Sequence, residues 1–349
     1  MSNKTLARRT QIKVKISGVD VSKNMNKYLL SMTYTDHEED KTDDLQISLD
    51  DREGFWIKNW LKSGKGNAKG AKITTQIIQK NWLSNGKDFV LHCGIFEIDS
   101  LDSSGPPGKV SIKATSLPHS STIRTVKKTR AWENIRLSAI AKQIAKKNKI
   151  KCMFLSSFNP KYKRREQVQK SDIVFLKRLC YNAGISLKVT GGLIVLFDAE
   201  AFEKKPAVRR IKKGTANVLS YRFGTNTNDT KYSRCRVTYT NPQTGQTITY
   251  TYKPRDTPKD GKTLEINEKV NTREEARQLA MKRLRRKNKK ENQAEFTLVG
   301  DVALVAGVTV NVIGWGIFDG KYIIETATHN VTGSGYTTQT KLRKVLVGY

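Results

Sequence analysis

The stretch SDIVFLKRLCYNAGISLKV, residues 171–189, contains the start and the end of one predicted helix and the strand that follows it. Ser171 is a typical N-cap residue, and Asp172 places a negative charge at the positive end of the helix dipole. Apolar side chains then recur at helical spacing, and Gly184 suits the left-handed position that ends a helix. The run ISLKV alternates apolar and polar residues as a strand does. The stretch therefore predicts a helix followed directly by a strand.

The neighbouring segments extend this unit in both directions. Before it, ENIRLSAIAKQIAKKN, residues 133–148, places apolar residues on one stripe and predicts an amphipathic helix. After it, LIVLFD, residues 193–198, predicts a second strand, joined to the first by a two-residue turn at Gly191 and Gly192. We therefore expect a middle domain at residues 126–203 that consists of two helices and a hairpin.

The first 125 residues predict a β-barrel. Apolar and polar residues alternate in QIKVKISG, DLQISLDD, FEIDSL and KVSIKATS, which are residues 11–18, 44–51, 96–101 and 109–116. Such alternation gives each strand one buried and one solvated face. The glycine-rich segments at residues 63–72 and 103–109 are predicted loops between the strands.

Residues 204–349 predict a second β-barrel that is interrupted by a basic helix. Strand-like alternation surrounds the turn NPQTG, residues 241–245, and returns near the C-terminus in VTVNVIGW, KYIIETATHNV and YTTQTKLRKVLV. The helix is expected at about residues 272–290, where Thr272 and Glu275 fit a capping box. The predicted fold class is therefore mainly β with an α+β insert, namely two related β-barrels and a helix-helix-hairpin middle domain.

The charge of the chain is extreme. Its 349 residues include 64 Lys and Arg against 32 Asp and Glu, which gives a formal net charge of +32. This predicts attraction to nucleic acid, to an anionic envelope polymer or to an acidic protein. The run KRLRRKNKK, residues 282–290, has the density to track a phosphate backbone. The motifs of sequence-specific recognition do not occur, so non-specific contact is favoured.

Cysteine spacing and hydropathy argue against several other classes of protein. The cysteines at positions 93, 152, 180 and 235 show no CxxC spacing, so we expect reduced, mostly buried thiols. The segment MSNKTLARRT lacks the apolar region of a secretory signal. No apolar run approaches the roughly 20 residues that a membrane helix needs. We expect a protein that is made in the cytoplasm and is not inserted into a membrane.

Candidates for catalysis or metal binding are few. His329 lies near a predicted strand end and is expected to be structural. Glu97 and Asp99 share a strand face opposite Ile98, so we expect both to face water rather than to act as an acid–base pair. The acidic run TDHEEDKTDDLQISLDD, residues 35–51, matches no calcium loop and is expected to be solvated. A docking surface for a neighbouring copy is the alternative.

These observations predict no catalytic, cofactor-binding or metal-binding residue, and no enzyme. The remaining histidines at positions 37, 92 and 119 belong to no catalytic motif, and no Walker loop or GxGxxG sequence occurs.

The segment QVQKSDIVFLKRLCYNAGISLKVTGGLIVLFD, residues 167–198, resembles the central signature of the phage late control D family, the hub proteins of contractile-tail baseplates. In that family a glutamine-rich lead-in precedes a helix and a hairpin that ends in an aromatic residue and an aspartate. The matching residues here are Gln167, Gln169, Ser171, Asp172, Phe175, Leu176, Leu179, Gly184, Phe197 and Asp198.

Four further motifs resemble the same family in the same order, so that the resemblance runs from about residue 12 to residue 342. They are a G-x-F-x-I-D strand with a GPP turn at 94–107, a helix with Trp132 at its start, a closing helix at 273–286 and a glycine-rich final region at 300–338. The final region contains Gly300, Gly307, Gly314, Gly320, Tyr322, His329 and the YTT of residues 336–338. The charge of +32 departs from what the family leads us to expect.

The resemblance implies a structural role. Hubs of this kind, like the N-terminal part of type VI secretion spike proteins, carry two similar β-barrels per subunit. Three subunits form a ring whose six barrels imitate a hexamer, so one face meets the hexameric tail tube and the other the trimeric central spike. The resemblance further implies baseplate wedge proteins as partners, contact with DNA or a tape-measure segment in the lumen, and a place in a virion tail or tailocin. It also implies that the conspicuous glycines are turn positions with positive φ.

Two other functions remain open at this point. A basic nucleic-acid-binding protein would bind DNA tightly with a steep salt dependence. A baseplate-associated cell-wall hydrolase would need a catalytic residue such as His329, Glu97 or Asp99, and we expect no additional segment to house such a domain.

Overall fold

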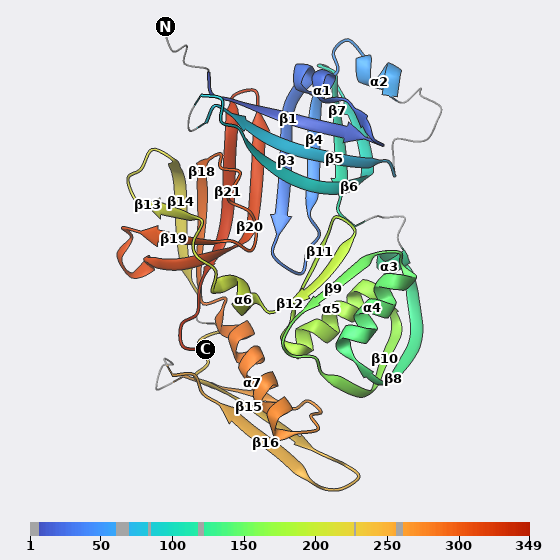
Figure 1. Cartoon of the computed structure of the whole chain (residues 1–349), viewed down its shortest axis with the longest axis vertical. Coiled ribbons are helices and arrows are strands. Elements are labelled where there is room, and N and C mark those ends of the chain that lie inside the picture. Colours follow the sequence, from blue (N-terminus) through green and yellow to red (C-terminus); the bar gives the residue numbers. More distant parts are fainter. Residues whose placement is uncertain (1–6, 61–69, 83–84, 118–121, 227, 256–260) are drawn as a thin grey trace.

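The computed structural model describes residues 7–60, 70–82, 85–117, 122–226, 228–255 and 261–349. Most of the predicted loop at residues 63–72, together with His119, lies outside this part of the chain. Figure 1 shows an elongated molecule with N-terminal strands at one end, an arm at the other and a helical domain at the side.

The N-terminal strands alternate between buried and solvated residues as predicted. They are β1 (Arg9–Ile16), β2 (Val19–Asp20), β3 (Leu29–His37), β4 (Asp44–Asp50), β5 (Lys72–Lys80), β6 (Phe89–Ser104) and β7 (Lys109–Thr115), accompanied by the helices α1 (Ser22–Tyr28) and α2 (Phe55–Trp60). Ile12, Val14, Ile47 and Ile112 contribute to one hydrophobic core. Burial of this apolar surface holds the region together.

A second group of strands forms from the C-terminal part of the chain. It contains β13 (Arg209–Lys212), β14 (Val218–Thr225), β18 (Asn292–Val299), β19 (Thr309–Ile313), β20 (Gly320–Thr332) and β21 (Gly335–Lys344), with the 3-10 turn η1 (Gly316–Phe318). These strands enclose their own core, which includes Phe296, Val310 and Tyr322.

The two groups of strands are joined edge to edge. Strand β20 pairs antiparallel with β3, with Thr328 opposite Thr35, and this pairing makes a single 13-stranded sheet. The sheet runs in the order β14-β18-β21-β20-β3-β4-β7-β6-β5-β1-β2, with β19 and β13 attached beside β20. The mainly β fold class is therefore confirmed. The sequence did not predict the junction, because the paired residues lie almost 300 positions apart.

The middle domain contains more strands than the sequence predicted. Its elements are α3 (Thr122–Thr125), β8 (Lys127–Arg136), α4 (Leu137–Lys147), β9 (Lys151–Leu155), β10 (Lys161–Ser171), α5 (Asp172–Ala183), β11 (Ser186–Thr190), β12 (Leu193–Phe197) and α6 (Ala199–Glu203). The helix expected from residue 133 begins at Leu137, because residues 133–136 pair with β10 as part of β8. Strands β8 and β10 form a two-stranded ribbon of their own.

The predicted ends of the helix in the opening stretch and the turn that follows its strand are confirmed. Helix α5 begins directly after Ser171 and ends at Gly184, whose φ is +66°. Gly191 and Gly192 both have positive φ and connect Thr190 to Leu193, which pair across the turn between β11 and β12. Such a turn suits glycine because a Cβ atom strains positive φ.

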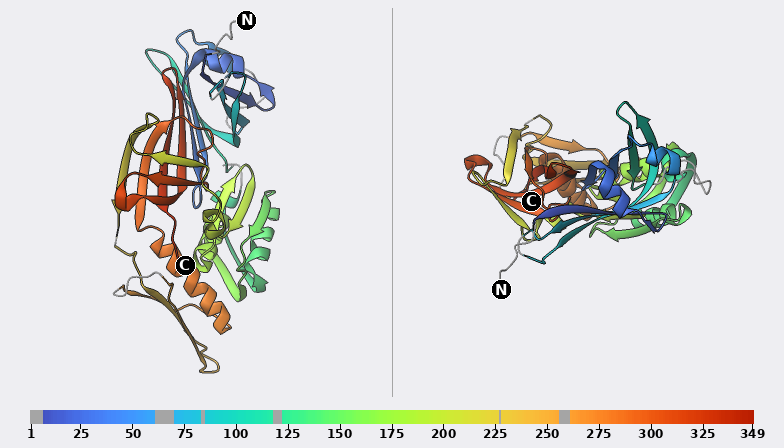
Figure 2. Two further views of the ribbon diagram at one scale, coloured as in Figure 1. Left: turned by 60° about the vertical axis from the view of Figure 1, so that its left-hand side comes forward. Right: turned by 90° about the horizontal axis from the view of Figure 1, so that it is seen from above.

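An arm projects from the end of the molecule that lies opposite the N-terminal strands (Figures 1 and 2). Strands β15 (Arg234–Thr240), β16 (Thr247–Tyr252) and β17 (Thr263–Ile266) form a separate three-stranded sheet. It packs against helix α7 (Arg273–Asn288) through Val237, Ala276 and Leu284. The sequence placed these strands with the second barrel, because alternation shows that a strand has a buried face but not which core it joins.

The start of α7 confirms one half of the predicted capping box. The Oγ1 atom of Thr272 accepts a hydrogen bond of 3.1 Å from the backbone N–H of Glu275. The carboxylate of Glu275 reaches back to the N–H of Asn271 at 2.7 Å, one residue before the cap.

The structure corrects the expectation for Gly300. Gly94, Gly307, Gly314 and Gly320 have positive φ as expected, but Gly105 and Gly300 do not. A Cβ atom on Gly300 would instead lie 2.1 Å from the ring of Tyr336. This glycine is required by the close approach of an aromatic ring rather than by a turn.

No helix in the described ranges is long and apolar enough to span a bilayer. All four cysteines are free, and Cys93, Cys180 and Cys235 are buried.

Candidate functional site

Several carboxylates of the acidic segment at residues 36–43 lie inside the molecule, where the N-terminal strands, the middle domain and α7 meet. Asp36, Glu38 and Asp43 are at most 5% exposed. The expectation that this run is solvated is therefore wrong for these three residues, whereas Asp40 and Asp44 are exposed. Buried carboxylates need compensating charge, and the cations come from distant parts of the chain, such as Lys188 of β11, which lies 2.5 Å from Asp36.

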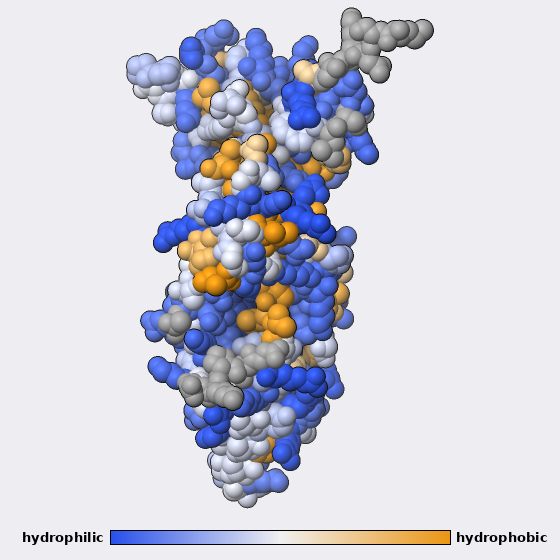
Figure 3. Space-filling model, turned by 90° about the vertical axis from the view of Figure 1, so that its left-hand side faces the viewer, coloured by the Kyte–Doolittle hydropathy of each residue, from blue (hydrophilic) through white to orange (hydrophobic). Residues whose placement is uncertain are grey.

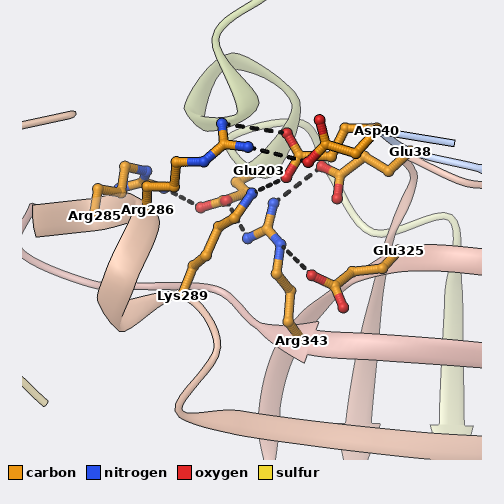
Figure 4. A network of polar contacts seen from close by, with 9 residues as sticks. Glu38, Asp40, Glu203, Arg285, Arg286, Lys289, Glu325 and Arg343 are labelled. Carbon is orange, nitrogen blue, oxygen red and sulfur yellow. Dashed lines mark hydrogen bonds and ion pairs between the residues drawn. The ribbon is translucent and has the colours of Figure 1, made fainter. Parts of the chain in front are cut away.

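Arg343 of β21 is the centre of this junction (Figure 4). Its side chain is fully buried, and its guanidinium contacts three carboxylates. Nη2 lies 3.0 Å from Glu38, Nε lies 3.3 Å from Glu325 of β20, and Nη1 donates to Glu203 of α6. Burial raises the pKa of Glu38, whereas Arg343 opposes that rise. The pKa of Arg343 is itself raised by the surrounding carboxylates, which outweigh its burial.

Helix α7 supplies further cations to the same junction. Arg286 lies 3.1 Å from Asp40, and Lys289 forms an ion pair with Glu39. Burial favours the neutral form of Glu39, but Lys289 and Arg286 outweigh it and lower the pKa of this residue to about 2. Glu39 therefore stays charged inside the molecule, whereas burial raises the pKa of Asp43 to about 6.

Three more cations of the basic run are also paired within the chain. Lys282 meets Asp198, Arg285 meets Glu203 and Lys287 meets Asp229. The idea that this helix tracks a phosphate backbone finds no support here, because its charges serve contacts between the arm, the middle domain and the strands.

Asp172 forms a second cluster, within the middle domain. Its side chain is fully buried and lies 2.5 Å from Lys128 and 2.7 Å from Arg130, both on β8. The side-chain amides of Asn148 and Gln167 each donate a hydrogen bond of 3.0 Å to it. Burial disfavours the charge, but these partners hold the pKa of Asp172 below its ordinary value.

Asp172 therefore does more than complement the helix dipole. It joins β8, β10, α4 and α5, whereas Ser171 makes no side-chain cap bond.

The other residues of the central signature also make packing contacts. The rings of Trp132 and Phe175 stack with centroids 4.9 Å apart. Asp198 accepts a hydrogen bond of 2.8 Å from Ser156 and forms its ion pair with Lys282 of α7. A Cβ atom on Gly184 would lie 2.5 Å from the Cβ atom of Lys282, so this glycine permits the contact between α5 and α7. The signature is thus a set of scaffold contacts.

The residues considered for catalysis do not come together. His329 is fully buried on β20, with Nδ1 2.7 Å from the hydroxyl of Tyr336, and burial lowers its pKa to about 4. Glu97 and Asp99 lie on β6, which β7, β4 and β3 separate from β20 in the sheet. Both are half-buried rather than fully solvated, which corrects that expectation. Within the described residues no group of three or more His, Cys, Asp or Glu is placed to hold a metal ion.

Comparison with known sequences identifies relatives among phage tail proteins. Residues 123–343 match the sequence model of the YQBQ-like family. A probable baseplate hub protein of Escherichia phage P2 is 31% identical over 182 residues, which is 52% of this chain and 43% of that protein. Its counterpart in Escherichia phage 186 is 28% identical over 185 residues, 53% of this chain and 44% of that protein. The matched regions span less than half the length of these relatives.

Solved structures share the fold over almost the whole chain. The 43 kDa tail protein of prophage MuSo2 from Shewanella oneidensis has a TM-score of 0.67 at 16% identity and covers 96% of this chain and 98% of its own. A tail protein from Neisseria meningitidis MC58 has a TM-score of 0.68 at 13% identity and covers 96% of both chains.

A component of the Escherichia coli type VI secretion system has a TM-score of 0.59 at 12% identity and covers 97% of this chain and 78% of its own. At such identities the likeness establishes the fold alone. The phage and prophage relatives are named as tail and baseplate proteins, not as enzymes. Because the family model covers more than half of its residues, the chain belongs to the YQBQ-like family, and it is related to phage baseplate hub proteins as the late control D signature implied.

Proposed function

We propose that this chain is the structural baseplate hub of a contractile phage tail, a tailocin or a related injection system. Three copies form a ring that adapts the hexameric tail tube to the trimeric central spike. The observation that carries the proposal is the 13-stranded sheet, in which two strand-rich halves of one chain lie edge to edge through β3 and β20. Three chains then present six such halves in a ring.

One face of this sheet suits a water-filled lumen. Where β20 meets β3, its side chains are polar and hydrogen-bond across the strands, as Thr33 does with Asn330 at 2.9 Å. A shallow hollow of about 240 Å³ continues this polar surface and is lined by Thr328, Gln339 and Lys341, among others. We propose that this face lines the channel of the ring, where it would meet DNA or a tape-measure segment.

The two ends of the sheet suit contacts between subunits. Within the described residues β14 pairs with β18 alone, and the first part of β1 pairs only with β5, so both strands have an open edge. Figure 3 shows apolar patches on the side of the molecule that carries β13, β14 and β19. Leu219, Tyr221 and Ile317 are among its exposed residues. If the edge of β14 in one subunit contacts the edge of β1 in the next, repetition of this contact gives a ring when each subunit is rotated by 120° relative to its neighbour.

The proposed partners follow from this role. They are the tail tube protein on one face of the ring, the central spike protein on the other and baseplate wedge proteins outside. The chain would then be made in the bacterial cytoplasm and end in the tail of a virion or tailocin.

The test is the mass of the purified chain in solution, measured by light scattering at low and high salt. We expect about three times 39.4 kDa at both salt concentrations, because packed strand edges resist screening. Ile317→Lys places a charge in the proposed contact and should give monomers, whereas Lys341→Gln on the lumen face should leave the trimer intact. A wild-type chain that stays monomeric and binds DNA with a steep salt dependence would overturn the proposal in favour of nucleic-acid binding.

A further inference from the structure

A groove of about 490 Å³ lies between strand β10 and helix α5 of the middle domain. Its strand wall includes Arg164, Arg165 and Lys170, and its helix wall includes Phe175, Arg178 and Leu179. A smaller cavity adjoins it and shares Arg165 and Leu179, so the hollow continues toward the arm. A volume of this size accommodates several side chains of a partner.

The groove follows the open edge of a strand. Within the described residues β10 pairs with β8 alone. Arg164 and Arg165 are consecutive and leave the strand on opposite faces, yet both line the groove. The groove therefore runs along the edge of β10 rather than across one face. An extended segment of a partner can pair with such an open strand edge and so become a further strand, with the helix on its other side.

In the part of the chain that the structure describes, three of the four cations of the groove lack a carboxylate partner, whereas Arg164 pairs with Glu133 and with Glu166, which also lines the groove. Arg165, Lys170 and Arg178 form no ion pair within 4 Å among the described residues. Arg165 rests on the ring of Tyr162 at 4.5 Å, and its buried Nε donates no hydrogen bond there. In the basic run at residues 282–290, by contrast, six cations form ion pairs with carboxylates from other parts of the chain.

The composition of the middle domain agrees with this shortage of carboxylates. Residues 126–203 contain 17 Lys and Arg against six Asp and Glu. Of the six, Asp172 and Asp198 are already paired with cations away from the groove, and Glu166, which lines it, is paired with Arg164.

We propose that this groove binds an extended acidic segment of a partner protein, which adds a strand to the edge of β10. Alternate carboxylates of the segment would meet Arg165, Lys170 and Arg178, and the side chains between them would pack on Phe175 and Leu179 and on Val168, which is 55% exposed. A nucleic acid would use the cations but neither the strand edge nor the apolar wall. The inference does not depend on the hub role, because a monomer carries the whole groove.

The probe is a fluorescein-labelled peptide of alternating Glu and Val, about ten residues long to match β10. Its affinity for the full chain is measured by fluorescence anisotropy at physiological ionic strength. Lys170→Glu with Arg178→Glu reverses two charges in the groove. The matched control, Lys142→Glu with Lys147→Glu, makes the same change in net charge on the exposed face of α4.

We expect the groove variant to bind about tenfold or more weakly and the control to change by about twofold or less. A peptide with proline at alternate positions should also lose about tenfold against the wild-type chain, because proline cannot complete a strand pairing. Hydrogen exchange should slow at residues 164–170 when the peptide binds.

Three results would overturn the proposal. They are the absence of peptide binding to the wild-type chain, equal losses in the two double variants, and tighter binding of an oligothymidylate of equal charge with the same dependence on Lys170 and Arg178. The last result would assign the groove to single-stranded nucleic acid.

Discussion

The two buried charge clusters of this protein have opposite compositions. In the middle domain one carboxylate, Asp172, lies among two cations and two amides. At the junction one cation, Arg343, lies among three carboxylates. The partners of Asp172 are all within 44 residues of it, whereas Glu38 is 305 residues from Arg343. The first cluster orders one domain, and the second fastens separate parts of the chain to each other.

The clusters also differ in what remains when the central residue is removed. Lys128 and Arg130 keep some contact with water, with side chains 17% and 23% exposed. Glu38 and Glu203 are 2% and 1% exposed. An unpaired charge costs more where water cannot reach it. Removal of the central residue should therefore destabilise the protein more at the junction than in the middle domain.

Arg343→Met should produce the largest effect. It leaves three carboxylates without their shared cation, and we expect the free energy of unfolding to fall by about 3–5 kcal/mol. Urea denaturation followed by circular dichroism measures the change. Lys341→Met is the control on the same strand, because Lys341 is 68% exposed in its ion pair with Glu295. Equal stability of the two variants would show that Arg343 does not hold the junction.

Asp172→Asn should cost somewhat less, about 3 kcal/mol, because the two cations that it leaves can regain water. The same urea titration tests it, with Glu166→Gln as an exposed control on β10. If Asp172→Asn lowered the free energy of unfolding more than Arg343→Met does, the middle-domain cluster would contribute more to stability than the junction. Loss of native near-UV dichroism in the middle domain, with the strands still folded, would confirm that the effect is confined to one domain.

His329 is buried without a charge, in contrast to the two charge clusters, and it should make the free energy of unfolding depend on pH. The pKa of His329 is about 4 in the folded chain, below its ordinary value of 6.5, because it is buried. The unfolded chain therefore binds more protons between pH 6.5 and 4, and stability falls as the pH falls through this window. Between pH 7 and 4, His329→Gln should lose about 2–3 kcal/mol less than the wild type does. If the stability of the wild type and of His329→Gln depended on pH in the same way, His329 would not be the group responsible.

The smallest effect is expected at an exposed pair of the basic helix. Lys287 and Asp229 form an ion pair, but Asp229 is 61% exposed. Lys287→Gln should change the free energy of unfolding by less than about 1 kcal/mol, because water and salt screen such pairs. A thermal melt at low and high salt measures it. A larger loss would mean that this end of α7 contributes to the junction as strongly as Arg286 and Lys289 do.

Local features of the fold were predictable from the sequence, and the contacts between its parts were not. Helix α5, the turn at Gly191 and Gly192 and the first turn of α7 each depend on signals within a few residues. Strands β8 and β10 escaped prediction because KYKRREQVQK carries polar residues on both faces, and the ribbon leaves most of them exposed. In the sequence Gly300 looks like a turn glycine, but the structure shows that the close approach of the Tyr336 ring requires it.

The candidate site was predictable only in its middle-domain part. Gln167 and Asp172 stood out as members of the central signature, and the structure brings them together at 3.0 Å. Arg343 stood in an ordinary strand pattern, and nothing near it in the sequence pointed to Glu38 or Glu203. The acidic run was interpreted as solvated because its charge density is typical of a surface loop, and burial became favourable only with cations supplied from β11, α7 and β21.

The pairing of β3 with β20 has a consequence for the order of events during synthesis. The strand that covers the edge of residues 31–37 is residues 326–332, which leave the ribosome only after almost 300 further residues have been made. In the interval the edge of β3 is open and Glu38 has no guanidinium beside it. A chain that stops short of Arg343 keeps an adhesive strand edge and an uncompensated carboxylate, which are features that chaperones and proteases recognise in unfinished proteins. The two halves of the sheet can thus become one body only after β20 and β21 have been made.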